Sequence, residues 1–133
     1  MQLQFREVQL LDLWRTHHPN KPVPSEVSND ELKGWECVHD SQVVGHCNGH
    51  SATGEILGLS VVSAYRRQGI GRRLLSLLVV SLRNAGTKRV WLAAPADPAQ
   101  SAYGFYRAVG WAPTGERTEN GDEILELSSG DCG

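Results

Sequence analysis

The sequence predicts an α/β protein: a single domain over residues 1–127, with a central mixed β-sheet of about seven strands flanked by about four helices. Its 133 residues are 40% hydrophobic and 21% charged, which is ordinary for one globular domain. Strand-like runs come first in the chain, and strand-like and helical runs then alternate. Residues 63–88 form a link long enough for a right-handed crossover between parallel strands, so we expect a mixed sheet.

The first elements are a strand and two short helices. Residues 3–8 alternate weakly, as a strand does, and residues 9–17 place leucine and tryptophan side chains on one helical face. The prolines at 19, 22 and 24 predict the loop that follows. Residues 28–31, Ser-Asn-Asp-Glu, are typical of a capped helix start, and we expect this helix to reach residue 33 or 34.

Three strands joined by tight turns are expected next. Residues 35–39 and 42–50 predict a hairpin with its turn at Asp40 and Ser41. Gly54 closes a second turn, and the following strand covers residues 55–63.

The second half of the chain alternates helices and strands. A long apolar helix should end at Asn84, because Gly86 follows it as a stop signal. Residues 88–94 predict a strand, and residues 98–109 a helix with Asp97 as N-cap and Pro98 at its first position. Two strands, 111–115 and 123–127, complete the fold, and residues 128–133 are expected to be a flexible tail.

Composition and charge argue against several classes of protein. The formal net charge of -2 shows no basic excess, so we expect no nucleic-acid partner. The longest apolar run, residues 74–82, is too short to cross a bilayer, and the N-terminus lacks the apolar run of a secretion signal. The three cysteines include no C-x-x-C pair. These features predict a cytoplasmic protein with reduced thiols and no membrane association.

The stretch from Leu57 to Asn84 carries the first functional signal. An apolar strand leads into a short turn with glycines and arginines, and a helix follows. The first turn of a helix has unpaired N–H groups and the positive end of the helix dipole, so it attracts phosphate. Arg66, Arg67, Arg72 and Arg73 crowd the same turn. The alternative interpretation is a glycine-rich helix start whose arginines are simply solvated.

Two common phosphate motifs do not fit this turn. A P-loop needs G-x-x-x-x-G-K-[ST], which is absent from the sequence. A dinucleotide fingerprint needs a third glycine, but Leu74 stands at that position. It also needs an acidic residue about 20 residues further on, where this chain has the basic residues Lys88 and Arg89. The pattern [RQ]-x-x-G-x-[GA] does fit, through Arg66, Gly69 and Gly71.

That pattern resembles the pyrophosphate loop of the GNAT acetyltransferase superfamily. A second segment, A-Y-G-F-Y-R-A-V-G-W, is similar to another signature of the family, with Ala102, Phe105, Tyr106, Gly110 and Trp111 in the matching positions. The resemblance extends from the first strand to Leu127. One position departs: an asparagine frequent in the family is replaced here by Ala99.

The resemblance implies acetyl-CoA as cosubstrate, and it assigns the residues that bind it. In the family, the strand before the loop is bulged and pairs with the pantetheine arm, a role that falls to Leu59, Ser60 and Val61. Gly58 next to them permits a bulge. The pyrophosphate would be surrounded by Arg67, Gln68, Gly69, Ile70, Gly71 and Arg72. Arg66 would also bind the cofactor, and the alternative for Arg66 and Arg73 is the 3′-phosphate or solvent.

Acetyl transfer to an amine needs a proton donor and a proton acceptor. The resemblance implies that Tyr106 protonates the leaving thiolate and also contacts the cofactor, with Tyr103 as the substitute. A phenol has a pKa near ~10, so it can donate at neutral pH. Glu55 is the candidate base, at the start of the strand and, by period-2 alternation, on the face of Leu57, Leu59 and Val61. Packing alone would also explain Tyr106, and surface exposure Glu55.

The identity of the base and of the acceptor stays open in the sequence. His46 and His50 share one face of the neighbouring strand, and either histidine or a water could replace Glu55 as base. No cluster has metal-ligand spacing, so we expect no metal. The final loop carries acids that would attract a cationic amine, or would simply be solvated: Glu116, Glu119, Asp122 and Glu123.

Two functions are compatible with these residues. The first is an acetyl-CoA-dependent N-acetyltransferase that acts on a primary amine of a small molecule, peptide or protein by direct attack. The second is a CoA-binding regulatory or partner-activating module on the same fold with little turnover. The protein is expected to be a monomer or a homodimer in either case.

Overall fold

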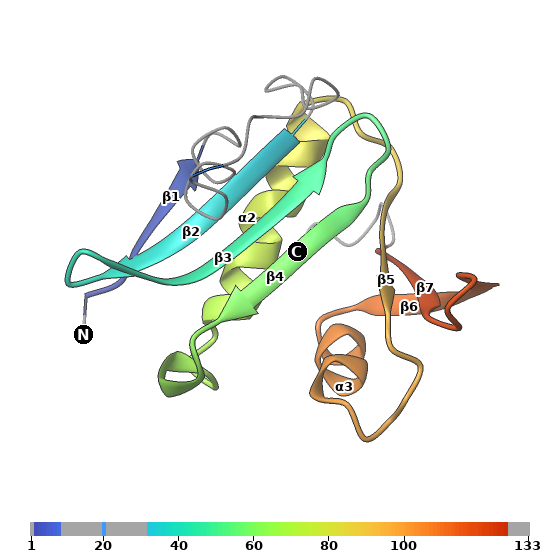
Figure 1. The fold of residues 1–133 in the computed structure, drawn as a ribbon. Coiled ribbons are helices and arrows are strands. Elements are labelled where there is room, and N and C mark those ends of the chain that lie inside the picture. The colour runs from blue at the N-terminus through green and yellow to red at the C-terminus, as the bar shows by residue number, and fades with distance from the viewer. Residues whose placement is uncertain (1, 9–19, 21–31, 128–133) are drawn as a thin grey trace.

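The computed structural model describes residues 2–8, 20 and 32–127, and they form two antiparallel sheets with two α-helices (Figure 1). The first sheet has the strand order β1-β2-β3-β4 and the second the order β5-β7-β6. The strands of the first sheet are β1 Gln4–Val8, β2 Leu32–His39, β3 Gln42–His50 and β4 Ile56–Val61. Those of the second sheet are β5 Val90–Ala94, β6 Trp111–Arg117 and β7 Glu123–Leu127.

The predicted α/β class is confirmed, and its details change in two respects. The seven strands divide into two sheets, and the one parallel pairing among the described residues is an isolated bridge between Glu55 and Trp91. The described residues hold two α-helices, α2 Ile70–Asn84 and α3 Ser101–Ala108, and not about four. A short 3-10 helix, η1 Ser63–Tyr65, precedes α2. The helix predicted at residues 9–17 lies outside the described residues.

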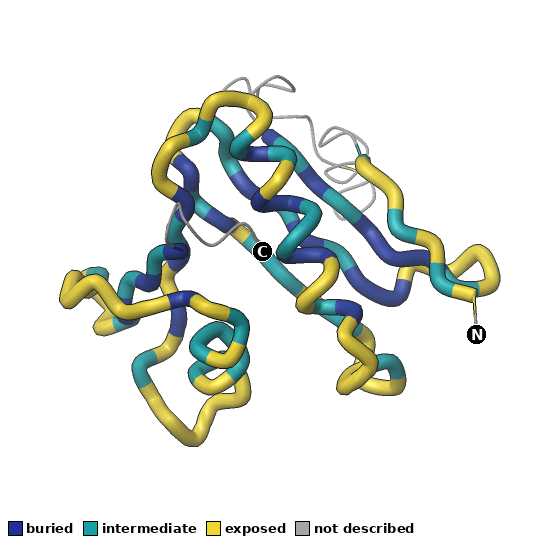
Figure 2. The backbone as a smooth tube through the Cα atoms, turned by 180° about the vertical axis from the view of Figure 1, so that it is seen from behind, coloured by how far each residue is buried: buried dark blue, intermediate teal, exposed yellow. Residues whose placement is uncertain are grey.

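Helix α2 packs against one face of the first sheet and supplies six of the sixteen described residues of the buried core (Figure 2). Its apolar residues recur every three or four positions, so Leu74, Leu78 and Leu82 are all fully buried. Burying each such side chain contributes ~2 kcal/mol. Two glycines of β3 let the helix approach closely: a Cβ at Gly45 would lie 3.1 Å from a Leu74 methyl, and one at Gly49 3.3 Å from a Leu82 methyl.

The predicted hairpin between β2 and β3 is confirmed. Asp40 and Ser41 both have positive φ values, 51° and 65°, as a two-residue type I′ turn requires. The helix expected to reach residue 33 or 34 is wrong over its described part. Leu32 is buried and pairs with His50, so β2 starts there and runs three residues further back than the sequence predicted.

The predicted helix at residues 98–109 starts later than expected. Helix α3 begins at Ser101 and ends at Ala108, and its N-cap is Gln100. The Asp97 carboxylate accepts the backbone N–H of Ala99 at 2.9 Å, which closes a local turn in place of a helix cap. No α-helix in the described part of the chain combines the length and the apolar character that crossing a bilayer needs.

Candidate functional site

Strands β4 and β5 are bridged at one end and then diverge, and we call the diverging part the fork (Figure 1). The bridge joins Glu55, just before β4, to Trp91 in β5. Beyond it β4 pairs only with β3, and β5 pairs only with β7. Two strand edges therefore face each other without pairing. Such edges carry N–H and C=O groups that can bind an extended ligand as a strand would.

Strand β4, along one side of the fork, has a β-bulge next to Gly58, the residue that the sequence indicated would permit one. Gly58 pairs with Asn48 and Ile56 with Gly49, which leaves Leu57 as the extra residue. A Cβ at Gly58 would lie 2.9 Å from the Asn48 side-chain oxygen, so this carboxamide lies directly over the glycine.

The bulge overturns the predicted alternation of side chains along this strand. Leu59 pairs with Cys47, whose thiol bonds the carbonyl of Leu74 in α2, so both side chains face the helix. Ile56 is buried on the same side, opposite Gly49. Glu55, next to Ile56, then faces away from α2. We call that side of the first sheet the outer face, and Glu55 does not share a face with Leu59 and Val61.

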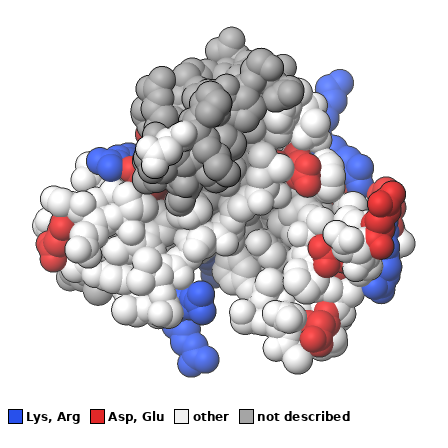
Figure 3. Space-filling model, viewed as in Figure 1, with Lys and Arg blue, Asp and Glu red and all other residues white. Residues whose placement is uncertain are grey.

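The loop at the open end of the fork has the geometry of an anion site. Gly69 is the N-cap of α2 with φ 80°, and Arg67 also has a positive φ of 65°. No side chain caps the helix, and its first turn holds no acidic residue. The N–H groups of that turn therefore point into a loop whose exposed side chains include Arg67 and Arg72. In Figure 3 basic side chains project at this edge of the molecule.

Not every arginine of the loop is directed at the helix start. The Arg66 guanidinium donates from Nε to the carbonyl of Val61 at 3.2 Å, which ties the loop to the end of β4. Arg73 lies over the Phe5 ring in β1, 5.1 Å from its centroid. The entrance to the loop is held by His39, whose Nδ1 is 2.7 Å from the Tyr65 hydroxyl.

Helix α3 brings two aromatic residues to the other side of the fork. Phe105 lies against α2, because a Cβ at Gly71 would be 3.6 Å from both the Phe105 ring and a Val61 methyl. Tyr106 is half-buried, with its ring edge-on to those of Phe105 and Trp111. Burial, and to a smaller extent Cys47, raise the pKa of its phenol above the ordinary value. Tyr106 is thus a neutral hydroxyl at neutral pH.

The sequence and the fold are similar to those of known acetyltransferases. The sequence matches the model of the acetyltransferase (GNAT) family over residues 4–111. The chain belongs to this family. No curated protein matches it in sequence.

Solved GNAT structures share the fold across nearly their full lengths. The PaiA N-acetyltransferase from Thermoplasma acidophilum, in complex with coenzyme A, is 17% identical with a TM-score of 0.72, covering 96% of this chain and 99% of that one. An aminoglycoside 6′-N-acetyltransferase complexed with coenzyme A is 21% identical with a TM-score of 0.69, over 92% and 95%. The ribosomal-protein-S18-alanine N-acetyltransferase from Escherichia coli is 20% identical with a TM-score of 0.66, over 95% and 93%.

Tyr103, which the sequence predicted as the substitute donor, packs against Arg107. The Arg107 guanidinium lies 3.6 Å from the centre of the Tyr103 ring and also bonds Glu123 of β7 at 2.8 Å. Glu123 is buried, and Arg107 holds the pKa of its carboxyl below the ordinary value. This ion pair, which the sequence did not reveal, fixes α3 to the second sheet and so positions Tyr106.

Some of the acidic side chains of the β6–β7 hairpin form ion pairs with arginines of the same chain. Arg89 bonds Glu116 at 3.0 Å and Glu126 at 2.9 Å, and Glu123 is paired as described above. Two of the four acids predicted to attract a cationic acceptor are therefore already engaged. The described residues contain no group of three or more His, Cys, Asp or Glu side chains placed to hold a metal ion.

A polar row crosses the outer face of the first sheet, and sequence reasoning missed half of it. Arg6 pairs with Glu36, Glu36 with His46, and His46 with Ser60, one residue from each strand. Arg6 bonds the Glu36 carboxylate through Nε. The sequence had identified His46 and Ser60. Glu36 depends on cross-strand register, for which the sequence holds no local signal.

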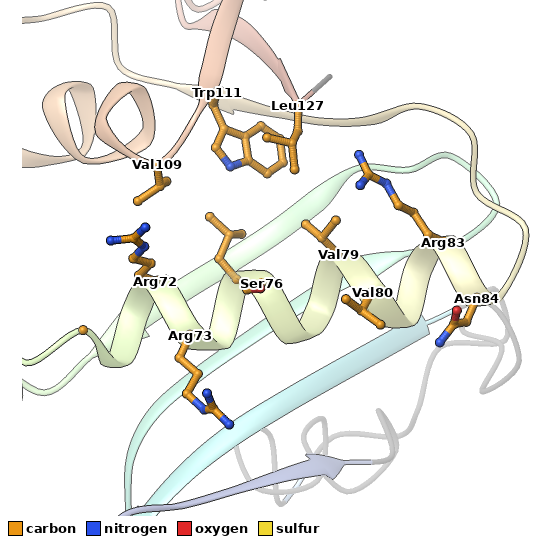
Figure 4. A pocket seen from close by; sticks show the side chains of 12 residues that line it. Arg72, Arg73, Ser76, Val79, Val80, Arg83, Asn84, Val109, Trp111 and Leu127 are labelled. Carbon is orange, nitrogen blue, oxygen red and sulfur yellow. The ribbon is translucent and has the colours of Figure 1, made fainter. Parts of the chain in front are cut away.

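A hollow of about 650 Å³ lies elsewhere, along the side of α2 turned away from the first sheet (Figure 4). In Figure 4 Val79 of α2 points across it toward Trp111 and Leu127, and Val109 also lines it. It shares Gly69 and Arg72 with the loop, but no lining residue belongs to β4 or β5. The unpaired strand edges and Tyr106 are at the fork, so we place the candidate site there.

Proposed function

We propose that this protein transfers the acetyl group of acetyl-CoA to a primary amine of a small molecule, peptide or protein, by direct attack of the amine on the thioester. One observation carries the proposal: the unpaired edge of β4 is followed, after η1 and the arginine-bearing loop, by the N-terminus of α2, which no side chain caps. An extended pantetheine arm with a pyrophosphate at its end complements this order: its amides can pair with the strand edge, and its negative charge can lie at the helix N-terminus. The GNAT relatives solved with coenzyme A support the assignment.

The cofactor is bound by backbone groups and by arginines. Leu59, Ser60 and Val61 offer the edge of β4 to the pantetheine amides, and the N–H near Leu59 polarises the thioester carbonyl. The pyrophosphate is held at the start of α2 by the loop residues Arg66, Arg67, Gln68, Gly69, Ile70, Gly71 and Arg72. Among these, Arg66 acts through its bond to Val61, which keeps the loop against the strand.

Acetyl transfer needs one proton donated to the leaving thiolate and one proton removed from the attacking amine. The amine nitrogen forms a bond to the carbonyl carbon, the bond from that carbon to sulfur breaks, and the thiolate takes the proton of the Tyr106 hydroxyl. Burial keeps this phenol protonated, as an acid requires. The ammonium proton leaves on the outer face, where Glu55 and two histidines are the candidates to receive it. His46 and His50 lie on that face as well.

Release of free thiol from acetyl-CoA tests the function. A panel of polyamines, amino sugars and short peptides should contain an acceptor that gives turnover in the wild-type protein. Glu55→Gln combined with Tyr106→Phe should then reduce kcat by ~100-fold or more, because acid–base groups typically contribute that much. Undiminished turnover in the double variant would refute this mechanism. If CoA raises the Tm and no acceptor releases thiol, the protein is a CoA-binding module with little turnover.

A further inference from the structure

The polar row on the outer face ends beside the residues proposed to hold the thioester. Arg6, Glu36, His46 and Ser60 occupy directly opposed positions on four successive strands. Directly opposed residues of antiparallel strands point to the same face, with Cα atoms about 4.5–5.5 Å apart. The bulges lie elsewhere, between Cys37 and Val38 and beyond Asn48, so the row keeps its register.

Backbone spacing places His46 nearer to the thioester than Glu55. His46 is directly opposite Ser60, next to the Leu59 N–H that polarises the carbonyl. Glu55 precedes Leu59 by four residues, which is about 13 Å along an extended strand before the bulge shortens it. His46 therefore has the shorter reach to the proposed position of the acceptor amine.

Glu36 has an unusual environment for a carboxylate. The residue is only 6% exposed, although it lies in a strand one position from the edge of the sheet. A buried carboxylate is costly unless its charge is compensated. Arg6 compensates it from one side by bonding Oε1, and the Arg6 side chain is half-exposed. His46 is the directly opposed residue on the other side.

We propose that His46 is a further catalytic residue that takes the proton of the acceptor amine, and that Glu36 is the positioning residue that orients its imidazole. In this step the ammonium loses its proton to a ring nitrogen of His46. The resulting imidazolium is stabilised by the carboxylate and returns its proton to solvent after transfer.

Of the described residues, those at the two directly opposed positions face the imidazole from the neighbouring strands. Glu36 faces it from β2, and Ser60, which does not titrate here, faces it from β4. Arg6 is one strand further away, and its charge is engaged by Glu36. His50 lies two pairs along the same face, opposite Glu55, whose carbonyl accepts its backbone N–H.

The inference rests on the proposed function, and a pH profile separates the two. Thiol release with an acceptor from the panel is measured from pH 5.5 to 9.5 for wild type, His46→Gln, Glu36→Gln and the matched control Glu7→Gln. Glu7 is an exposed carboxylate of β1 that accepts the Ser81 hydroxyl on the α2 side. Wild-type kcat/KM should rise through a limb at or above pH ~6.5, the range of an imidazole.

In His46→Gln that limb should disappear and kcat/KM should fall by ~100-fold, with the KM for acetyl-CoA unchanged. In Glu36→Gln the limb should move to lower pH, because the imidazolium loses its carboxylate, and kcat/KM should fall by ~10-fold. Glu7→Gln should match wild type. A limb that persists in His46→Gln and disappears in Glu55→Gln would overturn the inference and leave the proposed function intact.

An NMR titration tests the pairing without any acceptor. The His46 imidazole resonances should titrate at lower pH in Glu36→Gln than in wild type, and at the same pH in Glu7→Gln. An unchanged midpoint in Glu36→Gln would show that the carboxylate does not act on this imidazole, which overturns its positioning role. If no acceptor in the panel gave thiol release with the wild-type protein, the proposed function would be refuted instead.

Discussion

Trp91 fastens the turn before Glu55 with two hydrogen bonds, at the point where β4 and β5 part. Its backbone N–H donates to the carbonyl of Gly54 at 3.0 Å, and its indole N–H donates to the carbonyl of Thr53 at 2.9 Å. These bonds and the parallel bridge to Glu55 join the two sheets on one side of the fork only. The fork can therefore be open at its far end while its near end stays fixed.

Gly54 should be essential for this junction, and Gly69 should not. Both glycines have a φ near 80°, but a Cβ at Gly54 would lie 1.7 Å from the carbonyl oxygen of Arg89, whereas nothing lies within 4 Å of one at Gly69. Gly69→Ala should cost ~1 kcal/mol in the free energy of unfolding, from backbone strain alone. Gly54→Ala should cost more than ~4 kcal/mol or prevent folding. Urea denaturation of both variants measures this, and equal costs would contradict the described turn.

Arg72 should contribute to cofactor affinity through the charge of its guanidinium. It is exposed in the first turn of α2, where a charged hydrogen bond to phosphate is worth ~1.5 kcal/mol, or roughly a tenfold change in Kd. Arg72→Gln should therefore weaken CoA binding about tenfold in calorimetry, and added salt should reduce the difference. Lys88→Gln, which removes an exposed cation outside the loop, is the control. Equal losses in both variants would indicate a general charge effect instead.

Phenylalanine substitutions at Tyr106 and Tyr103 should distinguish a catalytic hydroxyl from a ring that only packs. Tyr106→Phe removes the proposed acid and should lower kcat by ~100-fold, with little change in Tm or in the KM for acetyl-CoA. Tyr103→Phe keeps the ring under Arg107 and should leave kcat within about twofold of wild type. A larger loss in Tyr103→Phe than in Tyr106→Phe would transfer the acid role to Tyr103.

The buried thiols should be inert in the folded protein. Burial raises the pKa of Cys47 to about 12 and also raises that of Cys37. In a Cys132→Ser background, neither thiol should react with a disulfide reagent at pH 8 until guanidinium unfolds the chain. Rapid reaction of either thiol in the native protein would contradict the described core.

The same raised pKa fixes the sign of a pH effect on stability. The unfolded Cys47 thiol ionises near pH ~8.5, and the folded one only near its higher pKa. Its contribution is therefore complete below pH ~8.5 and is lost as the pH rises towards 12, because the unfolded state then binds fewer protons. The free energy of unfolding should fall less steeply between pH 9 and 11 in Cys47→Ala than in wild type.

The sequence predicted the local elements of the site well, because each has a local cause. The turn at Asp40 and Ser41, the helix ending before Gly86 and the glycine turn at Gly69 where α2 starts all follow from turn and capping chemistry. The predicted bulge near Gly58 is also present. Its consequence for Glu55 could not be predicted, because one extra residue reverses the alternation of every side chain before it.

Long-range pairing explains the remaining differences. Leu32 joins β2 because it is buried against His50, and this tertiary contact overrides the helix predicted from the residues just before it. Asp97 caps a turn rather than a helix. The residues around an aspartate do not determine which of the two it caps. The row that holds Glu36 opposite His46 depends on the register of three strand pairs, and the ion pair of Arg107 with Glu123 on how α3 packs.

Hydrogen–deuterium exchange with and without CoA tests the central claim most directly, because it reports where the cofactor binds. CoA should protect the amides of residues 58–61 and of residues 67–72, and it should leave the second half of α2, at Val79 to Asn84, unchanged. Protection of Val79 to Asn84 without protection of residues 58–61 would place the cofactor in the hollow along α2. That result would contradict the assignment of the fork as the acetyl-CoA site.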